Sequence, residues 1–245
     1  MSNHGAHEQG RELGASTADT AGVAEALIEI VREHVDPDAY RWIENVLAES
    51  PSLAGERFST AFTATARRVG KRALELDPGA QARLRWAGAH EAPLTWTLDE
   101  LARAALLARA AATLPAEEFE RLLEAAYAGG DNRERRAVLR ALALLPRPQR
   151  FVPLAVEACR SSIEPLFEAV ACENPYPALH FPELNFNQMV LKALFIGVPL
   201  RRIVGLEARR TPELARMAAD YEAERRAAGR SVPADVDWLL GRVST

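Results

Sequence analysis

Apolar residues recur at the spacing of an α-helix along almost the whole sequence, and this periodicity constrains the fold more than any other feature. Near the start of the pattern, Val23, Leu27, Ile30 and Val31 fall on one face of a helix. The alternation of apolar and polar residues that is typical of a half-buried strand persists nowhere in the chain. The pattern therefore predicts an all-α fold.

Turn and capping signals divide this pattern into separate helices. Proline or glycine pairs interrupt it at intervals of about one helix length. Three sites carry a capping box, in which a side chain and the acid three positions later each satisfy a free backbone N–H; they are Thr97 with Glu100, Asp131 with Glu134, and Ser161 with Glu164. Together these signals predict helices at roughly 98–112, 115–128, 131–145, 151–160 and 162–173.

The connections between these helices are short, so consecutive helices are expected to pack antiparallel. A pair occupies about 33 residues, as in HEAT-like and other α-solenoid repeats, although no consensus letters repeat. We expect stacked antiparallel helical hairpins in a HEAT-like, α-solenoid-like right-handed superhelix, closed by a C-terminal helical cap. Residues 1–17 are predicted to be a disordered polar tail. Residues 18–245 are predicted to form a single all-helical domain, with the hairpin stack over 18–173 and a distinct C-terminal part over 174–245.

Charge, cysteines and missing motifs narrow the function classes. The 30 basic and 34 acidic side chains give a formal charge of −4, which does not favour nucleic acid as a partner. Cys159 and Cys172 belong to no metal-binding motif and are expected to be core thiols. No apolar run approaches the roughly 20 residues of a membrane span, and the polar N-terminal end lacks a signal peptide's apolar segment. We expect a cytoplasmic protein with no membrane-spanning helix, no cofactor and no metal.

The character of the sequence changes at Asn174, where alanine and arginine give way to aromatic, proline and amide residues. Two prolines within residues 174–177 predict a stiff, extended lead-in. A new helix is expected to begin at Pro182 and to end at Gly197, which can take the left-handed conformation. Apolar residues occupy almost its whole circumference, which predicts a buried helix.

The polar residues of this helix fall into two sets. Asn185, Gln188 and Lys192 share an arc of about 60° and are predicted to line a ligand-binding groove. Asn187 lies alone among apolar neighbours, and a buried amide needs partners. We therefore expect Asn187 to be a structural residue that pins the lead-in over 174–181, in which Asn174 is a second structural amide.

An arginine-rich turn follows the helix. Arg201 and Arg202 are candidates for an anionic group of a ligand, because the guanidinium fork suits phosphate and carboxylate. A solvated turn that pairs with neighbouring acids is the alternative.

An acid–base trio of His180, Glu183 and Lys192 is the candidate catalytic set. His180 and Glu183 alone supply too few ligands for zinc, and a histidine packed beside Phe181 is the simpler interpretation. Lys192 can equally be a lysine that extends from an apolar surface into solvent. The discriminating measurement is whether the three side chains converge.

Two C-terminal stretches resemble the EboA family of metabolite traffic proteins: FNQMVLKALFIGVPLRRIVGL from Phe186 to Leu206, and PELARMAADYEAERRAAGRSV from Pro212 to Val232. The resemblance implies an all-helical cytoplasmic protein. It also implies a role beside pathway enzymes and a UbiA-like membrane prenyltransferase in making, handling or exporting a secondary metabolite. It supplies no catalytic residues to transfer.

Three hypotheses follow for the function. The first is a non-catalytic protein that holds a small metabolite or a partner enzyme against Asn185, Gln188, Lys192 and the Arg201–Arg202 turn. The second is a metabolic enzyme of the same pathway that uses the acid–base trio. The third is a scaffold that docks another protein through an exposed apolar patch without any small ligand.

Overall fold

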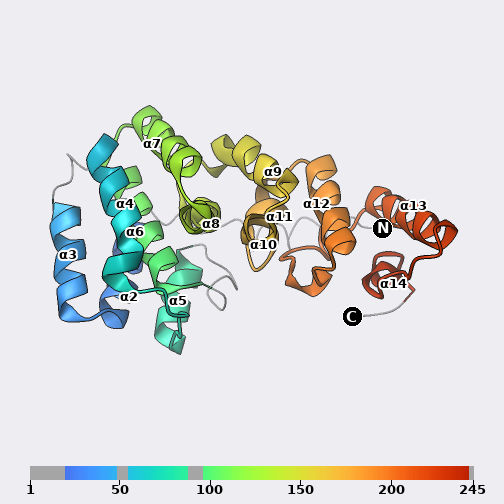
Figure 1. Ribbon diagram of the computed structural model, residues 1–245, viewed down its shortest axis with the longest axis horizontal. Coiled ribbons are helices and arrows are strands. Elements are labelled where there is room, and N and C mark those ends of the chain that lie inside the picture. The colour runs from blue at the N-terminus through green and yellow to red at the C-terminus, as the bar shows by residue number, and fades with distance from the viewer. Residues whose placement is uncertain (1–19, 49–54, 88–95, 243–245) are drawn as a thin grey trace, which may run out of the picture. The chain divides into compact units, whose positions relative to one another are not determined.

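The computed structural model describes residues 20–48, 55–87 and 96–242, and over these ranges the chain is helical (Figure 1). The described part has thirteen α-helices and no strand; Ala73 and Thr97 form one isolated antiparallel bridge there. The all-α prediction is confirmed. The α-helices are α2 (Thr20–His34), α3 (Pro37–Ala48), α4 (Gly55–Val69), α5 (Pro78–Trp86), α6 (Leu98–Thr113), α7 (Ala116–Gly129), α8 (Asn132–Ala141), α9 (Val152–Arg160), α10 (Glu164–Ala171), α11 (Tyr176–His180), α12 (Glu183–Ile196), α13 (Pro212–Ala227) and α14 (Asp235–Leu239). Short 3-10 turns are η2 (Leu142–Leu144), η3 (Pro148–Phe151) and η4 (Leu200–Arg202).

The chain divides into two compact units at the bond between Asn174 and Pro175. The N-terminal unit contains α2 to α10, and the C-terminal unit contains α11 to α14. The right-handed superhelix and the single domain over 18–245 stay predictions, and the predicted tail over 1–17 lies outside the described residues.

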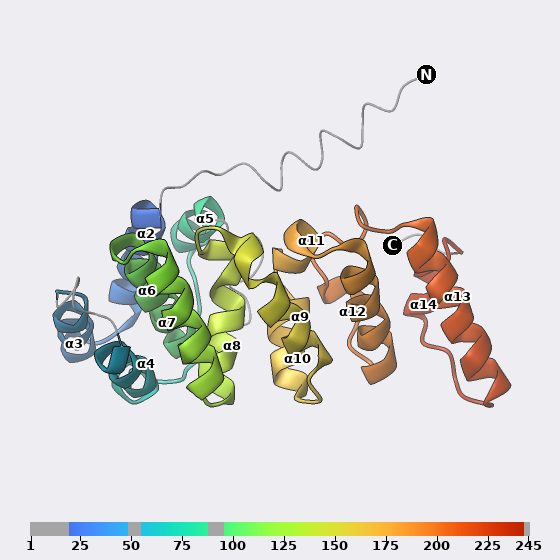
Figure 2. The same cartoon turned by 90° about the horizontal axis from the view of Figure 1, so that it is seen from above.

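The N-terminal unit is built around α6. Helix α2 packs on α6, α6 packs on α8, and α8 packs on α10, so helices far apart in the sequence form successive layers (Figure 2). Alanine and leucine line these contacts, and small side chains let helix axes approach closely. Helix α6 is buried over most of its length, including its charged residues Asp99, Glu100 and Arg103.

The helix starts predicted from capping boxes are confirmed at two of the three sites. The backbone N–H of Thr97 donates to Glu100 Oε2 at 2.9 Å, and that of Asp131 donates to Glu134 Oε2 at 2.8 Å. The third prediction is wrong. The Ser161 hydroxyl accepts the Ile163 N–H, and α10 begins at Glu164, because Pro165 fits the first helical turn, where no N–H is needed.

The C-terminal unit begins with a correction to the predicted lead-in. Residues 176–180 form the short helix α11 rather than an extended segment, because Pro177 is accommodated in its first turn. Helix α12 begins at Glu183, one residue after the predicted start. It ends as predicted at Gly197, whose φ of 82° is left-handed and inexpensive only for glycine.

Two further predictions concern burial and the membrane. Cys159 and Cys172 are buried, as predicted. Among the helices over 20–48, 55–87 and 96–242, none is long and apolar enough to cross a membrane.

Candidate functional site

Helix α12 carries most of the predicted site, and its two sides differ sharply. Phe186, Val190 and Ala193 are completely buried. On the opposite side, Leu184 is 61% exposed and Phe195 is 67% exposed. The prediction of a helix buried almost all round is therefore wrong. Leu184 and Phe195 are eleven residues apart, which returns to the same face of a helix after three turns. The described residues leave both side chains exposed on this face.

The predicted polar strip lies beside these exposed apolar side chains. Gln188 is exposed, and Asn185 and Lys192 are half-buried. At 100° per residue, Gln188 lies within about 40° of Leu184 around the helix axis, and Lys192 follows within another 40° or so. The exposed side of α12 is thus amphipathic, with an apolar stripe next to a polar strip.

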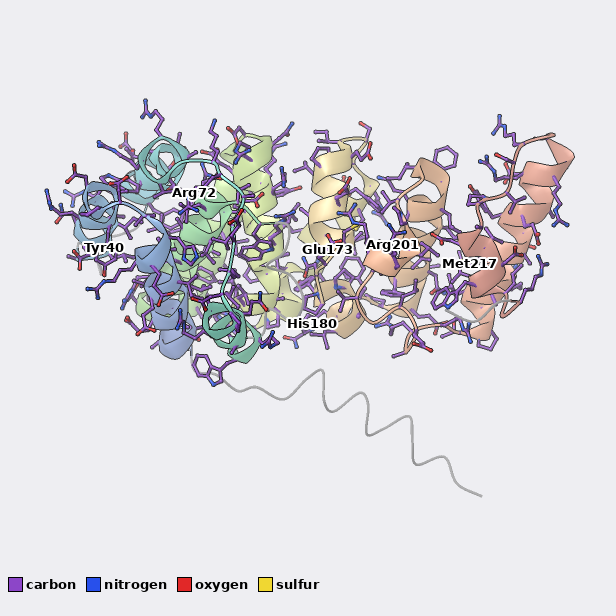
Figure 3. All side chains as sticks on the ribbon, turned by 90° about the horizontal axis from the view of Figure 1, so that it is seen from below. Tyr40, Arg72, Glu173, His180, Arg201 and Met217 are labelled. Atoms are coloured by element: carbon purple, nitrogen blue, oxygen red, sulfur yellow. The ribbon has the colours of Figure 1, made fainter. Side chains whose placement is uncertain are left out.

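The arginine turn follows α12 on η4. Arg201 is exposed and Arg202 is half-buried (Figure 3). Asp235, the first residue of α14, holds this turn. Its Oδ2 accepts a hydrogen bond from the Leu200 N–H at 2.8 Å. Because η4 follows the C-terminal end of α12, Arg201 and Arg202 are the residues of the predicted site that come last along the chain.

A residue that the sequence analysis missed, Arg209, fixes the connection between α11 and α12. Its guanidinium donates to the carbonyl oxygen of Ala178 at 2.7 Å and to that of Phe181 at 2.8 Å. It also lies over the Phe186 ring, with Cζ 4.6 Å from the ring centroid. Burial lowers the pKa of Arg209 from its usual value, against the opposing charge of Glu183.

Asn187 does not pin this connection, so the role predicted for it is wrong. The side chain is 1% exposed, yet neither its Nδ2 nor its Oδ1 has a hydrogen-bond partner among the described residues. The predicted structural amide Asn174 behaves differently. Its Nδ2 donates to the carbonyl oxygens of Ala169 at 2.9 Å and Leu139 at 3.3 Å, inside the N-terminal unit.

The candidate acid–base trio is divided between two helices, with His180 at the end of α11 and Glu183 and Lys192 on α12. Glu183 and Lys192 are nine residues apart, which places them on opposite sides of the helix and about 13 Å apart along its axis. The exposed Glu183 accepts a hydrogen bond from the Thr211 hydroxyl at 2.9 Å. His180 packs on the Tyr176 ring at 4.9 Å between centroids, and burial lowers its pKa. The geometry does not favour the enzyme hypothesis.

The largest charged cluster of the described chain lies in the N-terminal unit and was not anticipated. Asp99 Oδ2 pairs with Arg103 at 2.7 Å, and Asp99 Oδ1 pairs with Arg133 at 2.7 Å. Burial raises the pKa of Asp99, but hydrogen bonds from Arg133 and Thr97 and the charges of Arg133 and Arg103 outweigh it and leave the pKa below its usual value. The sequence carried a signal for this cluster, since Asp99 and Arg103 are four residues apart in a helix rich in alanine and leucine.

The same cluster joins the two capping boxes. Glu100, which caps α6, also binds Arg140 at 2.6 Å and Arg136 at 3.1 Å on α8. Arg103 in turn donates through Nε to the carbonyl oxygen of Phe62 at 3.0 Å. These contacts lock α6 against α8 and α4. Among the described residues, no group of three or more His, Cys, Asp or Glu side chains is arranged to hold a metal ion.

Comparison with known proteins gives the family. The sequence model of the family described as metabolite traffic protein EboA matches residues 23–241, nearly the whole chain. The chain belongs to the EboA family. The match extends well beyond the C-terminal stretches that suggested the resemblance, and it includes both units of this EboA protein. No curated protein and no solved structure matches the chain.

Proposed function

We propose that this EboA protein binds a small secondary metabolite on the exposed side of α12 and holds it without converting it. The observation that carries the proposal is the exposure of Leu184 and Phe195, at 61% and 67%, beside the polar strip. Water contact with large apolar side chains is unfavourable, and apolar surface exposed together on one face is typical of an interaction site. The family description of a metabolite traffic protein supports the same function.

The two kinds of residue have different tasks in this proposal. The apolar stripe contacts the hydrocarbon part of the metabolite. Asn185, Gln188 and Lys192 orient its polar groups, and Arg201 and Arg202 receive an anionic group where the metabolite has one. Pathway enzymes, including a UbiA-like membrane prenyltransferase, are the proposed donors and acceptors of the metabolite, and the cytoplasm is the proposed location.

The test is to incubate the purified full chain with extracts from cells that have or lack the neighbouring pathway genes, and to identify retained compounds by mass spectrometry. The matched variants are Leu184→Gln with Phe195→Gln, and Trp86→Gln as a control. Trp86 is the third large apolar side chain exposed in the described chain, at 49%, and it lies in the other unit. We expect wild type and the Trp86 variant to retain an unmodified compound and the double variant to lose it.

Other outcomes select the other hypotheses. A retained compound that is chemically converted supports the enzyme hypothesis. Capture of a protein through the apolar stripe, with no compound retained, supports the scaffold hypothesis. Either result contradicts the proposal of metabolite binding without turnover.

A further inference from the structure

Helices α12 and α13 lie next to each other in the C-terminal unit and run in the same direction (Figure 2). At the start of the pair, the Thr211 hydroxyl donates to Glu183 at 2.9 Å. Near its end, the Tyr221 hydroxyl donates to the carbonyl oxygen of Leu194 at 3.4 Å, a long contact. These two hydrogen bonds define the side of α12 that faces α13.

Asn187 lies on that side. Around the helix axis it is within about 40° of Glu183 and about 20° of Leu194. The two hydrogen bonds relate residues 28 and 27 positions apart, so the same register puts Leu214 of α13 opposite Asn187. Leu214 and, one turn later, Ala218 are completely buried. The amide of Asn187 therefore points into an apolar seam between α12 and α13.

This arrangement is unusual because both polar atoms of the amide are buried without a partner among the described residues. Each unpaired buried donor or acceptor costs about 1–3 kcal/mol. A leucine at this position fills a similar volume at no such cost. The remaining polar contacts of the C-terminal unit are well satisfied, as the paired donors of Arg209 illustrate.

We propose that Asn187 is the polar anchor of a binding site in the seam between α12 and α13, and that it takes a neutral group that both donates and accepts a hydrogen bond. A carboxamide or lactam on an apolar ring or chain has this chemistry, because it pairs with an asparagine amide through two parallel hydrogen bonds. The small side chain of Ala218 and the half-buried Met217 leave α13 an adaptable wall (Figure 3). A carboxylate does not suit the seam, since a charge would be buried without a counter-ion.

The inference rests on the proposed function and deepens it by naming the chemical class of the metabolite. The exposed stripe of α12 contacts the part of the molecule that remains outside the seam. Opening of the seam requires α13 to move away from α12. Helix α14 moves with α13, because Arg242 binds Glu222 of α13 through two hydrogen bonds of 2.8 and 2.9 Å.

The test uses three probes of similar shape on the full chain: benzamide, cumene and benzoate. The readout is the side-chain amide resonance of Asn187 in a ¹H–¹⁵N NMR spectrum, assigned by its loss in Asn187→Leu. We expect millimolar benzamide to shift this resonance and raise the melting temperature, and cumene and benzoate to leave the resonance in place. If the resonance instead shows exchange with an internal water and does not respond to benzamide, the amide is satisfied by water and the inference is wrong.

The variant Asn187→Leu gives an independent measurement, with Asn45→Leu, an exposed asparagine on α3 of the N-terminal unit, as its control. We expect Asn187→Leu to melt about 2–4 °C above wild type, because one unpaired buried group is removed from a chain of this size. We also expect this variant to lose the response to benzamide. Asn45→Leu keeps that response. A lower melting temperature for Asn187→Leu would show that the amide has a structural partner and would overturn the inference.

The two proposals fail in different ways. If Asn187→Leu still retains the extract compound that Leu184→Gln with Phe195→Gln loses, the proposed function stands and the Asn187 site is wrong. If benzamide shifts the Asn187 resonance while wild type retains nothing from any extract, the site stands and the proposed metabolite function is wrong.

Discussion

Glu100 of α6 and Arg140 of α8 form an ion pair of 2.6 Å with both side chains buried, and the same carboxylate caps the helix from which it comes. The Glu100 side chain thus caps the start of α6 and also joins α6 to α8, through a partner forty residues further along the chain. The pair does not need to add net stability over an apolar contact. Loss of one partner, however, leaves the other charged and buried.

Glu100→Ala is expected to destabilise the protein by about 3–5 kcal/mol, because Arg140 stays buried without its partner and α6 loses its cap. Chemical unfolding monitored by circular dichroism measures the change. The matched control is Glu213→Ala, whose partner Arg216 is 61% exposed. That solvent-exposed pair should contribute little to stability. Equal effects of the two variants would contradict the structural role of Glu100.

Arg209→Lys is expected to destabilise the C-terminal unit by about 2–3 kcal/mol, since a lysine cannot reach the carbonyl oxygens of Ala178 and Phe181 together. Faster hydrogen exchange in α11 and at the start of α12 measures the loosened connection. Arg210→Lys is the comparison, because the exposed Arg210 guanidinium donates to the Trp238 carbonyl oxygen at 3.1 Å and lies over the Trp238 ring, away from the α11–α12 connection. Unchanged exchange in Arg209→Lys would show that another contact holds the connection.

Stability is expected to fall as the pH drops below about 6.5, in part through His180. Burial lowers the pKa of His180 in the folded protein. As the pH falls below the usual pKa of histidine, the unfolded chain therefore binds a proton at this ring before the folded protein does. The neutral ring makes its full contribution to stability when the pH is above the pKa of His180 in the unfolded chain. This contribution is lost as the pH falls toward the lower pKa of His180 in the folded protein. His180→Phe keeps an aromatic contact with Tyr176 and removes the titration. Unfolding free energies at pH 8 and pH 5 should therefore differ less in this variant than in wild type.

Gly197→Ala is expected to cost about 1–2 kcal/mol, because an L-residue resists the φ of 82° that ends α12. No neighbouring atom lies within 4 Å of the added methyl group, so the cost comes from the backbone alone. Gly129→Ala in α7 is the control, since it also meets nothing within 4 Å and its φ is not positive. Thermal unfolding should show a loss for the first variant and little change or a gain for the second.

Local signals of the sequence predicted the elements well. The helices of the N-terminal unit, the cap residues Glu100 and Asp131 and the left-handed Gly197 all follow from interactions within a few residues. The predicted extended lead-in failed for a local reason as well, because a proline in the first turn is compatible with a helix.

The candidate site was predicted only in part. The polar strip of α12 follows from helical periodicity, whereas the exposure of Leu184 and Phe195 does not. Periodicity ranks the faces of a helix by polarity, but which apolar face is covered depends on the neighbouring helices. For the same reason the sequence analysis missed Arg209, which is 28 residues from Phe181 in the connection that it holds, and assigned the pinning role to the nearby Asn187.

The sequence by itself determined that this protein is helical, where α6 and α8 begin, where α12 ends, and which family it belongs to, because caps, turns and periodicity act over a few residues. Only the tertiary structure decided which side chains are buried together. It brought Glu100 to Arg140, left Leu184 and Phe195 uncovered, and buried the Asn187 amide without a partner. Such long-range contacts depend on the packing of whole helices, and no local pattern of residues specifies them.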